Sequence, residues 1–264
     1  MSFPYKTALI TGASSGIGAA FAEALAQRGC DLVLVSRSAD KLQALAAQLA
    51  QAHGRRAEVI VADLAQPAPA AALKRAVDAL GLGVDLLINN AGFGTHGPFA
   101  RADIERERRE IGLNVGAVVD IAHAFLPGML DARHGAVVNI ASMAAFQPMP
   151  YMAVYGATKA FVWSFSDALW AECRGRGVHV MAVCPGPVDT PFFEATGDHS
   201  LRKTVPRGGI IGAGTVVEAG LRGLLARERL VVPGTVGRLT SIFTRMAPRA
   251  VLTQVIGRHM SRGY

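Results

Sequence analysis

Residues 7–18 read Thr7-Ala8-Leu9-Ile10-Thr11-Gly12-Ala13-Ser14-Ser15-Gly16-Ile17-Gly18. The apolar run Thr7–Thr11 predicts a buried strand, and a helix is expected over Ile17–Arg28. Gly12 suits the tight turn after the strand, Gly16 lets the backbone approach a phosphate, and Gly18 permits close helix packing. Free N–H groups at a helix N-terminus bind pyrophosphate. We therefore interpret this segment as a phosphate-binding turn, formed by Gly12, Ser14, Ser15, Gly16, Ile17 and Gly18.

Short apolar runs alternate with helical stretches along the rest of the chain. The expected strands are Thr7–Thr11, Asp31–Ser36, Glu58–Ala62, Leu86–Asn89, Ala136–Ala141, His179–Cys184 and Leu230–Val232. The expected helices include Ile17–Arg28, Ala39–His53, Ala70–Leu80 and Val115–Ala132. Strands that are apolar throughout belong to parallel sheets covered on both faces. The pattern predicts an α/β fold, a doubly wound parallel sheet of the Rossmann type, and, since no repeat or linker interrupts it, a single domain over residues 1–264.

Composition narrows the class of protein. Hydrophobic residues make up 51% of the 264 residues and charged residues 18%, which indicates a well-cored globular protein. The N-terminus runs straight into the glycine motif and lacks the features of a signal peptide, so a cytoplasmic location is expected. The cysteines and histidines show no metal-ligand spacing, and no metal site is expected. The net charge is +7, but no nucleic-acid-binding motif accompanies it, and no nucleic-acid partner is expected.

The segment Tyr155-Gly156-Ala157-Thr158-Lys159 carries the chemistry. A Tyr and a Lys four positions apart on a helix lie one turn above each other on the same face. An ammonium beside the phenol is expected to lower the phenol's pKa and make it a usable acid–base group near neutral pH. With the phosphate-binding turn and the upstream Ser142, this pair predicts hydride transfer between a nicotinamide and a carbonyl or alcohol.

The end of the second expected strand bears on the cofactor. Rossmann proteins specific for NAD usually place an acid there to bind the ribose hydroxyls. This chain instead reads Ser36-Arg37-Ser38. A guanidinium pairs with a 2′-phosphate, whereas a carboxylate would repel it. Arg37 therefore favours NADPH/NADP+ over NAD(H).

At this point the chain resembles the classical short-chain dehydrogenase/reductase family, over nearly its whole length. The resemblance rests on motifs in the family's order and spacing: Thr11-Gly12-x3-Gly16-x-Gly18, Asp63-Leu64, Asn89-Asn90-Ala91-Gly92, Asn114, Ser142, Tyr155-x3-Lys159 and Pro185-Gly186. It implies four catalytic residues, Asn114, Ser142, Tyr155 and Lys159. It also implies further cofactor contacts at Asp63, Leu64, Asn90, Ala91, Gly92, Tyr155, Lys159, Pro185, Gly186, Val188 and Thr190. A homodimer or homotetramer, formed through the helices around Val115–Ala132 and Tyr155–Arg174, is implied as well.

Two segments stand outside the alternation. Residues 190–214 follow the end of a strand, where open α/β sheets bind ligands, and we interpret them as a substrate lid. Residues 237–264 form a basic, amphipathic C-terminal extension in which Leu239, Ile242, Phe243 and Met246 share one helical face. Pro248 should bend or restart that helix. The stripe either packs against the core or a second subunit, or lies on an anionic membrane, and the pattern alone leaves both open.

The expected substrate is an apolar ketone, aldehyde or secondary alcohol, because the loops near the site are rich in aromatic and Met residues. These residues are Phe93, Phe99, Met143, Phe146, Met149, Tyr151, Met152, Phe192 and Phe193. The alternative is a non-catalytic protein that binds nicotinamide nucleotides as a sensor. The mixed-charge segment Arg101–Glu110 is interpreted as a solvated or subunit-contacting helix face.

Overall fold

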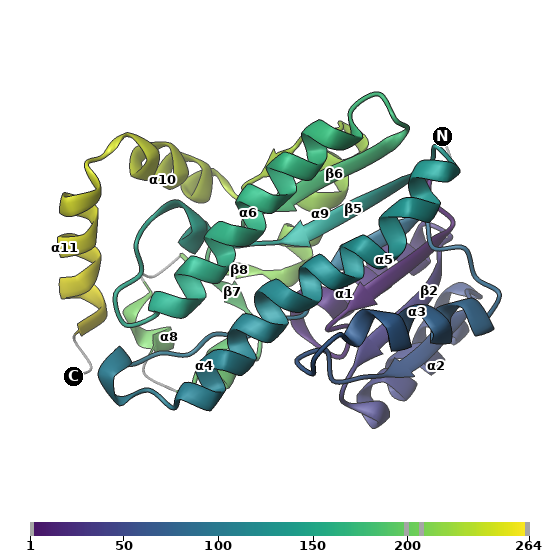
Figure 1. Ribbon diagram of the computed structural model, residues 1–264, viewed down its shortest axis with the longest axis horizontal. Helices are drawn as coiled ribbons and strands as arrows, with labels where there is room; N and C mark the ends of the chain where they lie inside the picture. The colour runs from purple at the N-terminus through teal and green to yellow at the C-terminus, as the bar shows by residue number, and fades with distance from the viewer. Residues whose placement is uncertain (1–2, 198–200, 206–208, 262–264) are drawn as a thin grey trace.

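The computed structural model describes residues 3–197, 201–205 and 209–261. Its centre is a seven-stranded parallel sheet with the strand order β3-β2-β1-β4-β5-β6-β9 (Figure 1). The strands are β1 (Thr7–Thr11), β2 (Asp31–Ser36), β3 (Ala57–Val61), β4 (Leu86–Asn89), β5 (Gly135–Ile140), β6 (Val178–Val183) and β9 (Leu230–Val231). Each lies within one residue of its expected bounds, and the predicted doubly wound Rossmann fold is confirmed.

Helices cover both faces of the sheet, which explains why its strands are apolar on both sides. One face packs against α1 (Gly16–Gln27), α2 (Ala39–His53) and α9 (Ala213–Leu225). The other packs against α3 (Pro69–Ala79), α5 (Ala117–Asp131) and α6 (Ala153–Cys173). The order in which successive strands are added to the sheet reverses between β1 and β4. The crevice at such a point, beyond the carboxyl ends of the strands, is where doubly wound sheets bind ligands.

The helix expected over Val115–Ala132 is part of a longer one. It begins with α4 (Ile104–Ile111), passes through a π-helical turn η2 (Gly112–Gly116) and continues as α5. The whole stretch Ile104–Asp131 has the length and hydropathy of a membrane span. Core helices of soluble proteins meet the same test, and here α5 buries Ile121, Phe125 and Met129 against the sheet.

The lid segment contains the short helices α7 (Phe192–Ala195) and α8 (Leu201–Thr204), and the strand β8 (Ile211–Gly212), which pairs with β7 (Val188–Asp189). Its residues 198–200 and 206–208 lie outside the described part of the chain. There are two short 3-10 helices in the loops that follow strands: η1 (Phe99–Arg101) follows β4, and η3 (Met143–Phe146) follows β5.

The C-terminal extension forms two helices, α10 (Thr235–Met246) and α11 (Arg249–Met260), at one end of the molecule (Figure 1). Pro248 separates them and is the N-cap of α11, so the expected restart at this proline is confirmed. Residues 262–264 of the extension lie outside the described part of the chain.

Candidate functional site: a nucleotide turn and a buried Tyr–Lys pair

The turn between β1 and α1 has the backbone that its glycines predict. Gly12 and Gly16 have φ angles of +67° and +56°, in the left-handed region that favours glycine. A Cβ on Gly18 would stand 2.3 Å from the carbonyl oxygen of Gly12, so only glycine permits the helix to start this close to the strand. The first turn of α1 contains no acidic residue, and its N–H groups are suited to an anionic phosphate.

Hydrogen bonds from the loop after β4 fix this turn. The Oγ1 of Thr11 accepts from the backbone N–H groups of Asn90 and Ala91, at 2.9 and 3.0 Å. The side-chain amide of Asn90 donates to the carbonyl oxygens of Thr11 and Gly12, at 2.9 and 3.3 Å. The loop Asn90–Gly92 therefore supports the phosphate-binding turn, as the family resemblance implies. Sequence reasoning did not assign Thr11 this role.

Tyr155 and Lys159 lie on the same face of α6. The Nζ of Lys159 is 5.8 Å from the centre of the Tyr155 ring and donates a 2.9 Å hydrogen bond to the carbonyl oxygen of Ile140, at the end of β5. Ser142, just beyond β5, accepts from the N–H of Ala144 at 3.1 Å and also interacts with the Tyr155 hydroxyl. The strand end and the helix thus bring all three side chains together.

The expected lowering of the Tyr155 pKa is wrong for the protein as it stands. Burial raises the pKa of this phenol to about 12, and the interaction with Ser142 opposes that rise. Burial also lowers the pKa of Lys159 to about 8, while the charges of Cys184 and Glu110 act in the opposite direction. Desolvation disfavours the charged form of both groups, and it outweighs the proximity of the two side chains on the helix.

Asn114 lies in the π-helical turn and is fully buried. Its side-chain amide donates to the carbonyl oxygen of Phe93 at 2.9 Å and to the Oγ1 of Thr158 at 3.1 Å, and its Oδ1 accepts from the N–H of Phe93 at 3.2 Å. A Cβ on Gly92 would stand 2.8 Å from this Oδ1 and 3.4 Å from the Lys159 Nζ. Asn114 therefore ties α4 and α5 to the catalytic helix α6 next to Lys159.

The residues assigned to the adenosine end follow β2 and β3. Arg37 is exposed at the end of β2. Asp63 follows β3, forms an ion pair with Arg109 at 3.3 Å, and its carboxylate accepts from the N–H of Ala65 at 3.1 Å. Although burial opposes it, hydrogen bonds from Gln66 and Ala65 and the charges of Arg109 and Arg37 hold the pKa of Asp63 below its ordinary value. Leu64 beside it is buried.

The residues assigned to the nicotinamide end follow β6. The carbonyl oxygen of Pro185 accepts a 2.9 Å hydrogen bond from the N–H of Met143. Gly186 faces the Met143 sulfur, and Val188 is buried in β7. Thr190 lies against Gly16, where a Cβ would stand 3.0 Å from the Thr190 methyl group. The nicotinamide end of the predicted site thus meets the phosphate-binding turn across the crevice.

Comparison with known proteins agrees with this geometry. A family model for short chain dehydrogenase matches residues 6–200. The chain belongs to the short-chain dehydrogenase family. This short-chain dehydrogenase is 32% identical over 245 residues to a very-long-chain 3-oxoacyl-CoA reductase of Rattus norvegicus, a match that covers 90% of this chain and 75% of the relative.

Two solved structures show the same fold with a nicotinamide cofactor. A short-chain dehydrogenase from Sphingobium yanoikuyae in complex with NADPH is 38% identical, has a TM-score of 0.82, and the match covers 90% of this chain and 92% of that one. A short-chain dehydrogenase/reductase from Burkholderia phymatum in complex with NAD is 29% identical, has a TM-score of 0.83, and the match covers 92% and 93%. The glycine turn and the acid-free start of α1 fit such a cofactor, so this short-chain dehydrogenase is an oxidoreductase with a nicotinamide site.

An apolar cluster adjoins Tyr155. Its buried members are Met152, Phe193, Leu201 and Met260, with Met149, Tyr151, Tyr155, Phe192 and Ile256 packed around them. The Phe192 and Tyr155 rings are 5.3 Å apart. Of the substrate-lining residues expected from the sequence, Phe99 is instead exposed, because η1 lies on the surface. Phe146 packs edge-on against Trp163 at 4.8 Å, in a separate cluster beneath α10.

A second titratable group near the Tyr–Lys pair was missed. The segment Arg101–Glu110 is expected to be a solvated or subunit-contacting helix face, yet within it Glu107 and Glu110 are buried, and Glu110 is fully so. Burial raises the pKa of Glu110 to about 7 against the opposing effects of Thr95 and Lys159. Among the described residues neither carboxylate oxygen has a hydrogen bond of ordinary geometry, although Thr95 lies beside them. In the sequence, the one sign that Glu110 is buried near the site is its position about one helical turn before Asn114.

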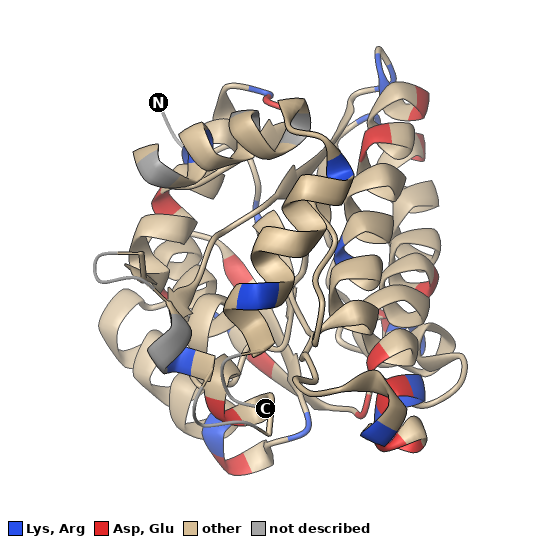
Figure 2. Cartoon of the chain, turned by 90° about the vertical axis from the view of Figure 1, so that its left-hand side faces the viewer, with Lys and Arg blue, Asp and Glu red and all other residues tan. Residues whose placement is uncertain are grey.

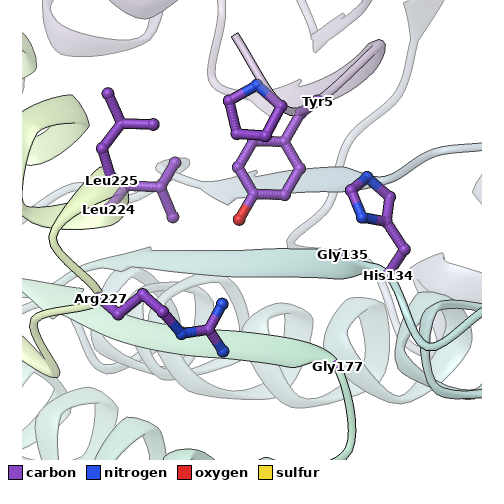
Figure 3. Close-up of a pocket in the computed structure, with 8 residues that line it drawn as sticks. Tyr5, His134, Gly135, Gly177, Leu224, Leu225 and Arg227 are labelled. Carbon is purple, nitrogen blue, oxygen red and sulfur yellow. The ribbon is translucent and has the colours of Figure 1, made fainter. Parts of the chain in front are cut away.

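A hollow of about 200 Å³ lies at the opposite edge of the sheet, where the strands begin (Figure 3). Tyr5 precedes β1, Gly135 starts β5, and Arg227 and His134 complete the wall. The glycine turn and the candidate catalytic residues Ser142, Tyr155 and Lys159 all lie toward the carboxyl ends of the strands. This hollow is therefore separate from the nucleotide site.

Proposed function

We propose that this short-chain dehydrogenase reduces an apolar ketone or aldehyde with NADPH. The observation that carries the proposal is the pair of the half-buried Tyr155 and the buried Lys159, which lies next to the Gly92 loop on one side and an apolar cluster on the other. When bound, the reduced nicotinamide supplies the hydride for the carbonyl carbon. The cofactor would be held by the glycine turn and the loops that follow β2, β3, β4 and β6.

The protein's own residues supply the proton and the stabilisation of charge. Ser142 and Tyr155 donate hydrogen bonds to the carbonyl oxygen, where negative charge develops. A raised pKa keeps Tyr155 protonated until that oxygen becomes basic enough to take its proton, which suits reduction. Lys159 then returns a proton to Tyr155. Asn114, held by hydrogen bonds to the Phe93 backbone, would anchor the water chain that brings the replacement proton from solvent to Lys159, as the family resemblance implies.

The preference for NADPH rests on Arg37. It is exposed at the carboxyl end of β2, where a carboxylate would otherwise bind the ribose hydroxyls. A charged hydrogen bond is worth about 1.5–3 kcal/mol, so Arg37→Asp should lower the ratio of NADPH to NADH affinity by about tenfold or more. Arg75→Asp, on the exposed side of α3, is the matched control. A variant at Arg37 that kept the full NADPH preference would contradict the assignment.

The apolar substrate is supported by the cluster beside Tyr155. Helix α11 contributes Met260 to it and the lid helices contribute Phe193 and Leu201, so the walls nearest the catalytic hydroxyl are apolar. The rat relative is named for a very-long-chain acyl substrate, which fits the same chemistry. We assign residues 190–214 the role of a lid because α7 and α8 pack onto this cluster over the strand ends.

The deciding experiment measures NADPH oxidation at neutral pH with a panel of hydrophobic ketones and aldehydes. Turnover by the natural chain that disappears in Tyr155→Phe supports the reductase. Tyr5→Phe removes another buried tyrosine hydroxyl, at the opposite edge of the sheet, and should retain activity. Tight NADPH binding without turnover of any substrate would instead support the alternative, a nucleotide-sensing protein.

We propose a homodimer or homotetramer formed through α4, α5 and α6. Ile111 and Phe161 are large apolar side chains exposed on these helices, and Phe161 stacks on Phe165 at 5.8 Å. Light scattering coupled to gel filtration should show an assembly that Phe161→Glu weakens. A natural chain that is monomeric at micromolar concentration would contradict this proposal.

A further inference from the structure

Helix α10 packs on the core through small and polar residues, whereas an amphipathic helix of a globular protein usually packs through its apolar face. Its inner face consists of small and hydroxyl-bearing residues, Gly237, Ser241 and Thr244. A Cβ on Gly237 would stand 3.3 Å from both the Met143 sulfur and a Val232 methyl group, so the helix backbone lies close to the core there. Leu239, Phe243 and Met246 of the expected apolar stripe are therefore not the surface by which α10 packs on the core, and the side chain of Ile242, the fourth member, lies outside the described part of the structure.

The buried hydroxyl groups of this inner face are satisfied within the helix. Ser241 Oγ donates to the carbonyl oxygen of Arg238 at 2.8 Å, and Thr244 Oγ1 donates to the carbonyl oxygen of Ser241 at 3.2 Å. Arg238 also donates a 3.3 Å hydrogen bond from Nε to the Val232 carbonyl oxygen. A buried polar group is tolerated when it is hydrogen-bonded. This face of α10 can therefore stay buried against the core.

The outer face of α10 carries three bulky apolar side chains. Leu239, Phe243 and Met246 recur at helical spacing and are 69%, 66% and 82% exposed. On α11, Val251 and Val255 are also more than half exposed. The two adjoining helices thus expose five large apolar side chains at one end of the molecule, here called the patch, and exposed apolar surface of this kind marks a site where a membrane or another molecule binds.

The charge around this patch is of one sign. Arg238, Arg249 and Arg258 are exposed on the same two helices, and residues 229–264 contain no Asp or Glu. Figure 2, which faces this end of the molecule, shows basic residues and no acidic ones on the helix pair. A twofold dimer would place this patch against its own copy and bring like charges together. The charge therefore favours an anionic surface over a second copy of this chain.

We propose that α10 and α11 dock this protein onto the surface of an anionic phospholipid bilayer. Leu239, Phe243 and Met246 enter the boundary between headgroups and acyl chains, and the arginines bind the lipid phosphates. The inner side of α11 reaches the active site, because Ile256 and Met260 belong to the apolar cluster around Tyr155. The helix pair thus stands between the bilayer and the catalytic hydroxyl. Delivery of a lipophilic substrate along this route rests on the proposed reductase function, whereas the docking itself does not.

The test is co-sedimentation of the full chain with sucrose-loaded vesicles of phosphatidylcholine containing a quarter phosphatidylglycerol. The natural chain should bind these vesicles and bind pure phosphatidylcholine about tenfold more weakly, since several arginines contribute to the electrostatic attraction. The variant Leu239→Ser/Phe243→Ser/Met246→Ser should lose about tenfold or more in partitioning. A matched control, Phe99→Ser/Ile104→Ser/Leu225→Ser, alters three exposed apolar residues elsewhere and should bind like the natural chain.

Two further measurements distinguish a loss of vesicle binding from a loss of folding or of activity. Thermal unfolding should be nearly unchanged in both triple variants because all six positions are exposed, and turnover of a short, water-soluble ketone should be unaffected by the α10 substitutions. Vesicle binding that is absent in the natural chain, or equal in the α10 variant, overturns the proposal. A change from dimer to monomer in the α10 variant, without vesicle binding by the natural chain, would show that the patch is a subunit interface instead.

Discussion

Replacing Glu110 by Gln should change how the stability of this protein depends on pH. The Glu110 carboxyl is fully buried, and its pKa is raised from 4.5 to about 7, chiefly by burial. A raised folded-state pKa means that the folded protein binds the proton more tightly than the unfolded chain does. The stabilisation is complete below pH 4.5 and is lost as the pH rises through 7.

The size of the effect follows from the two pKa values. Each pKa unit corresponds to about 1.4 kcal/mol, so the charged form of Glu110 destabilises the fold by about 3 kcal/mol relative to the neutral form. Part of that loss has already occurred at pH 5, because the unfolded carboxyl ionises there. About 2.5 kcal/mol should remain between pH 5 and pH 8. Glu110→Gln keeps the shape and removes the charge, and this loss should disappear in the variant.

The assay is urea unfolding of the natural chain and of Glu110→Gln at several pH values from 5 to 8. Other groups, including His179, whose pKa burial lowers, titrate in both proteins and cancel in the comparison. Glu105→Gln is the matched control, since Glu105 lies on the same helix and is exposed. Unfolding free energies of the natural chain and of Glu110→Gln that run parallel over this range would refute the argument.

Two further predictions concern the nucleotide turn. Thr11→Val should lower the unfolding free energy by about 2–4 kcal/mol, measured by urea unfolding, because the N–H groups of Asn90 and Ala91 lose their acceptor, whereas Thr11→Ser should be nearly neutral. Gly18→Ala should weaken NADPH binding about tenfold or more in a fluorescence titration, since its Cβ would push α1 away from Gly12. Gly128→Ala, where a Cβ meets nothing within 4 Å, should bind normally, and equal affinities would contradict the packing role of Gly18.

The fold and the gathering of the site could be predicted because both depend on local pattern. Strands that are covered on both faces are apolar throughout, so their bounds were read to within one residue. Most of the expected motifs follow the end of a strand, whereas Asn114 and the Tyr155–Lys159 pair lie on helices, and parallel strands end at the same edge of the sheet. Asp63, Asn90, Ser142 and Pro185 therefore had to meet once the sheet was parallel.

What the pattern missed depends on surroundings that lie far away in the sequence. Glu110 belongs to a run of charges that looks solvated, and its burial follows only from how α4 packs near α6. The pKa of Tyr155 is raised by burial, whereas the sequence predicts that it is lowered, and the reason is the same. Spacing places Lys159 on the same face of the helix, but it does not report that both groups are removed from water.

The C-terminal helix shows most clearly what periodicity leaves undecided. A hydrophobic stripe at positions 239, 242, 243 and 246 predicts that one side of α10 is apolar, but the direction of that side depends on what the opposite side can bury. Here the opposite side can be buried at low cost, because Ser241 and Thr244 bond to carbonyl groups of their own helix and Gly237 allows close approach. The core thus contacts the face that carries Gly237, Ser241 and Thr244, while Leu239, Phe243 and Met246 remain exposed. A stripe that faces solvent in the folded chain needs a partner, and its arginines select one with negative charge.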